Sequence, residues 1–162
     1  MNTVSSESIA NLEQERKEIL NAFRGLMRAL KDRNKEETKL IRKAFDVALE
    51  AHKEMRRKSG EPYIYHPIAV ARICAEEMGL GPIAVICALL HDTVEDTHIT
   101  LEDVEDLFGL KVRLIIDGLT KIPDVFDANA SIQAENFRKM ILTISEDFRV
   151  VLIKLADRLH NM

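Results

Sequence analysis

The sequence predicts an all-α protein, and its composition and patterning both support this. Hydrophobic residues make up 46% of the 162 residues, whereas aromatic residues make up only 5% and Trp is absent. A core built mainly from Leu, Ile, Val, Ala and Met favours helices over sheets. Apolar residues recur at helical spacing along most of the chain, without the alternation typical of strands. The length corresponds to about one domain.

The first two expected helices are amphipathic and are separated by a short polar break. Apolar residues recur at mostly helical spacing over about 6–31, which predicts the first helix. After the break at 32–34, a second apolar stripe predicts another helix. It should end near Lys58, because Gly60 and Pro62 follow and basic residues occupy its expected last turn.

Proline and glycine mark the ends of the next two helices. Pro67 is a natural first residue for the third helix, which Gly79 and Gly81 should end. Pro82 begins the fourth helix. Its apolar residues are nearly continuous over 83–90, so we expect it to be the central helix, buried on all sides.

A capping pattern marks the next helix. Thr100, with Asp103 three positions later, is close to a capping box and predicts a short helix that ends at Phe108. Gly109 interrupts the helical pattern, which resumes over 112–119.

The last part of the chain predicts a loop and two helices. We expect the loop at 123–131, one helix at about 132–144 and the other at 148–162. The last helix reaches the final residue without a C-cap, so we expect the natural domain to continue beyond it.

The net charge and the cysteines exclude several classes of protein. The formal net charge is −4, and a duplex-binding protein usually carries a basic face, so we expect no nucleic acid partner. Cys74 and Cys87 form no metal-binding motif and should be small buried residues in a reducing compartment. The N-terminus lacks a signal pattern, and the run 83–90 is too short to span a bilayer. We therefore expect a cytoplasmic protein without a membrane partner.

Ionisable residues follow the apolar run 83–90 directly. His91 and Asp92 come first, and Glu95 and Asp96 follow one helical turn later. Residues four apart share a helix face, so His91 should lie beside Glu95, and the two aspartates should lie side by side. Such groups are costly after a buried segment unless they are paired or metal-bound. The pattern predicts a metal site beside an acid/base pair.

Two further segments offer ligands to the same site. His66 and Asp157, combined with His91 and Asp92, would form a mixed nitrogen and oxygen set. Such a set is typical of sites for Mn, Fe or another borderline metal, and differs from the cysteine thiolate ligands of structural zinc sites. The side chains of neighbouring residues on a helix point about 100° apart, so His91 and Asp92 can both bind one ion only if the ion lies between them.

Simpler interpretations of these residues stay open. His91 and Asp92 could belong to a helix end, where the dipole stabilises the histidine. His66 could be a hydrogen-bonded loop histidine, and Asp157 could form a surface ion pair. The rival histidine ligands are His52, His98 and His160. Of these, His52 is expected to pack or to form a hydrogen bond.

The remaining charged groups also allow two interpretations. Glu95 and Asp96 could supply a general base and acid for attack by water, or could simply hydrate the helix end. The basic run 56–58 could hold phosphates, or could offset the dipole at a helix C-terminus.

Four ordered motifs carry a family resemblance. They read RKSGEPYIYHP at 57–67, LHDTVEDT at 90–97, DGLTK at 117–121 and KLADRLHNM at 154–162. Together they resemble the hydrolase domain of the RelA/SpoT family of alarmone enzymes, an all-helical member of the HD phosphohydrolase superfamily. The likeness runs from about Leu40 to the last residue. It implies an HD-domain helical bundle at 36–162, preceded by a helical extension at 1–35 and followed by further helices after Met162.

The resemblance implies Mn²⁺-dependent removal of the 3′-pyrophosphate from guanosine tetra- or pentaphosphate in the stringent response, giving GDP or GTP. Carried over by position, the ligands of one Mn²⁺ would be His66, His91, Asp92 and Asp157. The pair needed for hydrolysis would be Glu95 and Asp96. The nucleotide contacts would be Arg57, Lys58, Ser59 and Asn161.

Three functions follow from these observations. The leading hypothesis is an alarmone hydrolase that forms the N-terminal part of a bifunctional synthetase/hydrolase of the GTP pyrophosphokinase type. The second is another HD-type nucleotide phosphohydrolase, against which the base-binding segment 57–59 argues. The third is a non-catalytic regulatory module. The intact ligand set and the pair Glu95 and Asp96 argue against it.

Overall fold

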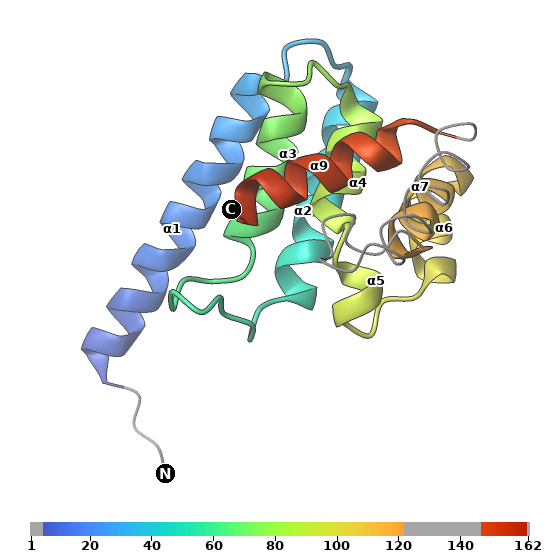
Figure 1. The fold of residues 1–162 in the computed structure, drawn as a ribbon. Coiled ribbons are helices and arrows are strands. Elements are labelled where there is room, and N and C mark those ends of the chain that lie inside the picture. Colours follow the sequence, from blue (N-terminus) through green and yellow to red (C-terminus); the bar gives the residue numbers. More distant parts are fainter. Residues whose placement is uncertain (1–4, 122–146, 162) are drawn as a thin grey trace.

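The computed structural model describes residues 5–121 and 147–161, and every regular element in these ranges is a helix (Figure 1). The helices are α1 (Ser6–Ala29), α2 (Lys35–Ala51), α3 (Tyr65–Glu76), α4 (Pro82–Leu90), α5 (Thr93–Asp96), α6 (Leu101–Phe108), α7 (Leu110–Lys121) and α9 (Arg149–Asn161). Strand-like pairing in these ranges is limited to one isolated bridge between Arg56 and Pro62. The predicted all-α fold class is confirmed.

Helix α4 is the centre of the molecule. Pro82 occupies its first position, as predicted, and every residue from 84 to 90 is buried. It packs against α2, α3, α7 and α9. Because the helix is covered on all sides, the residues that follow its C-terminal end, His91 and Asp92, are buried and partly buried, respectively. The prediction of a central, fully buried helix is confirmed.

Helix α1 joins the core through its second half only. Ile19, Phe23 and Leu26 are buried, and the Phe23 ring stacks on Phe45 of α2 with centroids 4.2 Å apart. The helix packs mainly against α3. Figure 1 shows it running along one side of the molecule, with its N-terminal turns projecting beyond the other helices. The division of the chain at residue 35 stays a prediction.

Replacing Asn34 by alanine should lower the free energy of unfolding by about 1 kcal/mol. Asn34 caps α2: its side chain accepts a hydrogen bond from the Glu37 backbone at 2.8 Å, and the Glu37 carboxylate accepts one from the Asn34 backbone at 3.1 Å. Urea unfolding measures the loss. The control is Asn21→Ala on the exposed side of α1. Equal unfolding midpoints for Asn34→Ala and the unchanged protein would contradict the capping role.

The second helix is shorter than predicted. We expected it to end near Lys58, but α2 ends at Ala51 and His52 is its C-cap. The residues after it are compatible with a helix, so no local signal ends it. Instead, the buried ring of His52 stacks on Tyr63, with centroids 4.8 Å apart. That contact requires the chain to turn back at this point.

The basic run therefore lies in a loop and not in a helical turn. The loop closes on itself: the Arg57 backbone donates to the Glu61 carbonyl at 2.9 Å, and the Tyr63 backbone donates to the Met55 carbonyl at 3.0 Å. Gly60 lies at its tip with φ +90°, a conformation that favours glycine. The interpretation of residues 56–58 as compensation for a helix dipole is wrong, because no helix ends there.

The ionisable stretch after α4 is not one continuous helix. The expectation that residues four apart share a face treats 91–96 as one helix, but α4 ends at Leu90 and the short α5 begins only at Thr93. His91 and Asp92 form the turn between them. The carbonyls of the last helical turn lack partners within the helix. The buried Thr93 hydroxyl supplies one such partner by donating to the Leu90 carbonyl at 2.7 Å.

Most other helix boundaries agree with expectation. Thr100 and Asp103 form the predicted capping box of α6. Helix α3 begins two residues before Pro67, which a first turn tolerates. Cys74 and Cys87 are buried free thiols. The expected loop at 123–131 and helix at 132–144 lie outside the described residues. In the described part of the chain, no helix is long and apolar enough to span a membrane.

Candidate metal centre

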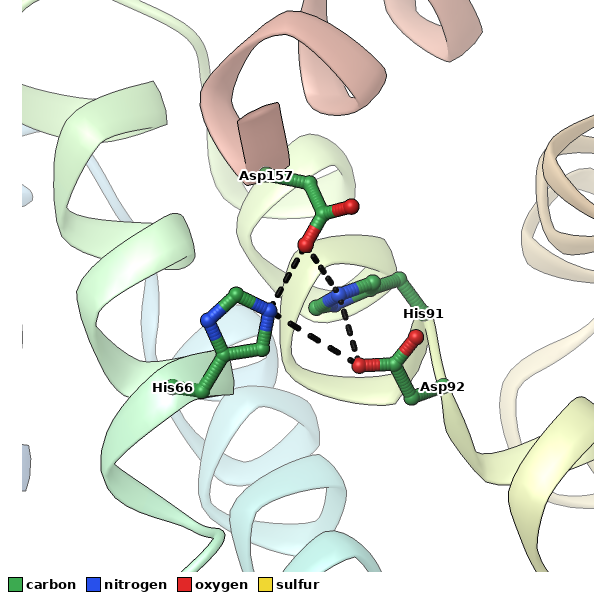
Figure 2. Close-up of side chains that lie close together, drawn as sticks. All are labelled: His66, His91, Asp92 and Asp157. Atoms are coloured by element: carbon green, nitrogen blue, oxygen red, sulfur yellow. Dashed lines mark hydrogen bonds and ion pairs between the residues drawn. The ribbon is translucent and has the colours of Figure 1, made fainter. Parts of the chain in front are cut away.

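Four side chains from three parts of the fold converge on one point (Figure 2). His66 lies in the first turn of α3, His91 and Asp92 form the turn after α4, and Asp157 lies on α9. One ligand atom from each lies within 4.8 Å of the others. These are the residues that the sequence predicted as metal ligands, so the fold brings together the whole expected set.

The distances in the cluster suit a single cation. Asp157 Oδ1 lies 2.6 Å from His66 Nε2 and 3.3 Å from His91 Nε2. Asp92 Oδ2 lies 2.9 Å from His91 Nε2 and 3.8 Å from His66 Nε2. An octahedral cation with bonds of about 2.1 Å holds neighbouring ligand atoms about 3.0 Å apart and opposite ones about 4.2 Å apart. The two nitrogen and two carboxylate donors therefore fit a borderline divalent metal.

Second hydrogen bonds orient both histidines toward the centre of the cluster. The Nδ1 hydrogen of His91 is donated to the Ala88 carbonyl at 2.5 Å, which leaves Nε2 for a ligand. His66 Nδ1 lies 2.6 Å from His160 Nδ1, so one of these two nitrogens donates to the other. A ligating His66 would donate and His160 would accept. Burial lowers the pKa of His160, and His66 and Arg57 lower it further, which favours this neutral acceptor.

The ionisation of the cluster is strongly coupled. Burial disfavours a charged His91, but hydrogen bonds to Asp157 and Asp92 outweigh burial and raise the pKa of His91 to about 10. Burial opposes ionisation of Asp92 as well, yet His91 and Tyr63 lower the pKa of that carboxyl to about 2. His66 and His91 likewise hold the pKa of Asp157 well below its ordinary value. At neutral pH the cluster thus carries anionic oxygens and a protonated His91.

Binding of Mn²⁺ should release about one proton per cation, because His91 must lose its extra proton to become a ligand. Since the pKa of His91 is raised to about 10, the proton is present at all lower pH values. The apparent Kd should therefore fall as pH rises, by up to about tenfold per unit between about pH 6 and 8. Calorimetric titration in buffers of different ionisation enthalpy measures the number of protons released per cation bound.

The control for this measurement is His98→Ala, because His98 is exposed and lies outside the cluster. That variant should keep the proton count and the slope. A Kd that does not change with pH would contradict the coupling between cation and proton.

Tyr63 and His52 complete the inner wall of the site. The Tyr63 hydroxyl donates to Asp92 Oδ2 at 2.6 Å. Burial, followed by the hydrogen bond to Asp92, raises the pKa of Tyr63, so the hydroxyl keeps its proton. His52 packs behind the ring and donates from Nδ1 to the Ala48 carbonyl at 3.0 Å, in agreement with the packing role expected for it. Sequence reasoning missed Tyr63, because nothing in the sequence distinguishes it from Tyr65 in the same motif.

Glu95 and Asp96 lie on α5, next to the cluster and outside its ligand set. Both side chains are exposed, and within the described residues no side-chain hydrogen bond or ion pair engages either carboxylate. His91, which was expected to lie beside Glu95, is close enough to lower the pKa of that carboxyl, but its hydrogen bonds go to Ala88 and Asp157. Partial desolvation and the negative charge of Asp92 raise the pKa of both carboxyls, while Lys154 on α9 lowers that of Glu95. Both groups are therefore free to accept protons beside the cluster.

A cavity of about 640 Å³ opens beside the four ligands. It is lined by Arg56, Arg57, Lys58, Ser59, Tyr63, His66, Asp92, Asp157 and Asn161. Arg57 donates to the Asn161 amide oxygen at 2.8 Å, which joins the loop 53–64 to α9 across the cavity. All four residues expected to contact a nucleotide thus line one cavity with three of the expected ligands. Arg56, the first residue of the basic run expected to hold phosphates, also lines the cavity and forms a 3.0 Å ion pair with Glu15 of α1.

Comparison with known proteins agrees with this arrangement. The chain matches the family model described as "HD domain" over residues 44–162. It is 50% identical over 128 residues to the bifunctional (p)ppGpp synthase/hydrolase SpoT of Escherichia coli (strain K12), covering 78% of this chain and 18% of that protein. It is 48% identical over 128 residues to a GTP pyrophosphokinase of Myxococcus xanthus, covering 76% of this chain and 17% of the relative. The chain thus spans about a fifth of the length of these curated relatives.

A solved structure is also similar. It is described as "A metazoan ortholog of SpoT hydrolyzes ppGpp and plays a role in starvation responses". The match has a TM-score of 0.59 and 32% sequence identity, and it covers 75% of this chain and 67% of that one. The likeness therefore extends from sequence to fold.

Proposed function

Because this chain belongs to the HD-domain family, in the branch that contains the RelA/SpoT hydrolase domains, we propose that it hydrolyses the 3′-pyrophosphate of guanosine tetra- or pentaphosphate. The products are GDP or GTP and pyrophosphate. The observation that carries the proposal is a mixed histidine and aspartate cluster at the floor of a cavity whose rim is basic. The names of the relatives also include a synthase and a pyrophosphokinase activity, which we do not assign to the residues of this chain.

The cation that we propose is one Mn²⁺, bound by His66, His91, Asp92 and Asp157. The HD domain implies a divalent metal, and the imidazole and carboxylate donors suit manganese. A divalent cation at this position would act as a Lewis acid and make water more acidic. The other tasks of the reaction fall to the side chains around it.

Glu95 and Asp96 handle the proton of the attacking water. Both lie beside Asp92; partial desolvation and the negative charge of Asp92 raise the pKa of each carboxyl and so make it a better proton acceptor, and within the described residues neither is engaged by a side-chain partner. Water attacks the phosphorus bonded to the 3′ oxygen, and one of the two carboxylates takes up its proton. The bond between phosphorus and the 3′ oxygen breaks, and pyrophosphate leaves. The 3′ oxygen regains a proton, so the nucleotide product ends in a hydroxyl.

The loop 53–64 binds and orients the nucleotide. Arg57 and Lys58 present two cations to the cavity, and Ser59 adds a hydroxyl. Guanidinium and ammonium groups offset the charge of phosphate oxygens, and the planar guanidinium also stacks on a base. Asn161 fixes Arg57 across the cavity, so α9 contributes both a metal ligand and a support for the nucleotide.

The function is tested by incubating the purified protein with Mn²⁺ and guanosine tetraphosphate and following release of pyrophosphate and GDP. We expect both products in equal amounts, with little hydrolysis of GTP, ATP or dGTP under the same conditions. Comparable hydrolysis of all these nucleotides would favour a general HD-type phosphohydrolase. Metal binding without any turnover would favour a non-catalytic regulatory module.

A further inference from the structure

The ring of Tyr63 lies between the metal ligands and α2. Its hydroxyl donates to Asp92 Oδ2 at 2.6 Å, and its ring forms a T-shaped contact with the His66 ring, with centroids 5.9 Å apart. On its other side the ring stacks on His52, whose side chain is 2% exposed and is anchored to the Ala48 carbonyl. Tyr63 is therefore held by its ring, while its hydroxyl reaches one ligand.

The hydroxyl contacts the same oxygen that faces the two histidines. Asp92 Oδ2 lies 2.9 Å from His91 Nε2 and 3.8 Å from His66 Nε2. A carboxylate oxygen accepts at two lone-pair positions. A hydroxyl that occupies one of them leaves the other directed at the centre of the cluster, so Tyr63 and a cation can share this oxygen.

Tyr63 becomes more important once a cation is bound. Within the described residues, the Asp92 carboxylate interacts with His66, His91 and Tyr63. When the two histidines turn their Nε2 lone pairs to a cation, they no longer donate to Asp92. The Tyr63 hydroxyl is then its remaining hydrogen-bond donor among these residues. Asp92 also lies in a turn, where the backbone constrains its side chain less than a helix would.

We propose that Tyr63 is a positioning residue that holds Asp92 in the rotamer that ligates the cation, with His52 supporting its ring from behind. This inference deepens the proposed function, because it rests on the same metal centre. It assigns a role to a residue outside the ligand set. Partners that orient a ligating side chain contribute about 10–100-fold to metal affinity or activity.

The test is Tyr63→Phe, which removes the hydroxyl and keeps the ring between His52 and His66. The matched control is Tyr65→Phe, a partly buried tyrosine two residues away that is outside the cavity lining. The Kd for Mn²⁺ is measured from the electron paramagnetic resonance signal of free Mn²⁺. We expect Tyr63→Phe to weaken binding about 10–100-fold. Tyr65→Phe should bind as the unchanged protein does.

The rate of hydrolysis by Tyr63→Phe at saturating Mn²⁺ shows whether the hydroxyl only positions Asp92 or also has another role. A weaker Kd with hydrolysis restored by excess Mn²⁺ supports the proposal, because the hydroxyl then acts only through Asp92. An unchanged Kd overturns it. A weaker Kd with hydrolysis that excess Mn²⁺ does not restore also overturns it, because the hydroxyl would then contact the reacting atoms. The Kd comparison needs no substrate, so it decides the role of Tyr63 even if the protein hydrolyses no guanosine tetraphosphate.

Discussion

Replacing Asp157 by alanine should weaken Mn²⁺ binding by more than about 100-fold and abolish hydrolysis, because loss of a ligand exceeds the 10–100-fold effect of losing a supporting partner. Asp157 is the ligand that α9 contributes, and its Oδ1 lies within hydrogen-bond distance of both histidines of the cluster. Its removal leaves three ligands and takes one of the two negative charges that offset the cation. Calorimetric titration with Mn²⁺ measures the loss of affinity.

The same variant should also be less stable without metal. The histidines lower the pKa of Asp157 in the folded state. A depressed pKa contributes stability above the ordinary carboxyl pKa, and that stability is lost as pH falls toward the folded value. At neutral pH the full contribution is present, so alanine removes it. Circular dichroism should verify that the variant is still folded during the titration.

The control is Asp46→Ala, which removes an exposed carboxylate whose ion pair with Arg42 lies on the surface of α2. Such a change should leave both Mn²⁺ affinity and stability nearly unaltered. Wild-type Mn²⁺ affinity in the folded Asp157→Ala variant would show that the cluster is not the metal site.

Replacing Glu95 or Asp96 by alanine should reduce turnover by about 10²–10⁴-fold while Mn²⁺ remains bound, since general acid–base groups contribute about that much. Both carboxylates lie on α5, outside the ligand set and beside it. Their removal takes away groups that accept a proton from water but leaves all four ligand atoms. Turnover and Mn²⁺ affinity should therefore separate in these variants, whereas both are lost in Asp157→Ala.

The matched controls are Glu102→Ala and Asp106→Ala, which remove exposed carboxylates of the next helix, α6. Each removes one negative charge, as Glu95→Ala and Asp96→Ala do, and should leave turnover and Mn²⁺ affinity unchanged. Retained hydrolysis in both Glu95→Ala and Asp96→Ala would contradict the proposed role of the pair. Loss of Mn²⁺ binding in either variant would instead assign that residue to the ligand set.

Helices with strong local signals were predictable from the sequence. Pro82 at the start of α4, the Thr100 cap of α6 and Gly109 between α6 and α7 are short-range features, and the structure agrees with each. The all-apolar run 83–90 also predicted its own burial. These features depend on neighbours a few residues away, so one sequence is enough to read them.

The two wrong helix predictions share a cause. Residues 52–58 and 91–96 carry no strong helix breaker, and both segments turn because of contacts with distant parts of the chain. His52 meets Tyr63, and the turn at His91 and Asp92 faces Asp157 on α9. Tertiary packing therefore overrides local propensity where the chain builds the site.

The ligand set was more predictable than its surroundings. A ligand is recognised by residue type within a motif, and all four expected ligands lie together. Supporting contacts lack such a signature: Tyr63 is one of two tyrosines in its motif, and only the fold directs its hydroxyl at Asp92. The contact between Arg57 and Asn161 likewise joins residues far apart in the chain.

Hydrolysis of guanosine tetraphosphate in water labelled with heavy oxygen tests the central claim most directly. If the protein directs water to the phosphorus bonded to the 3′ oxygen, mass spectrometry should find the label in the released pyrophosphate. The 3′ hydroxyl of GDP should carry no label. Label in GDP, or consumption of the substrate without release of pyrophosphate, would contradict the proposed reaction.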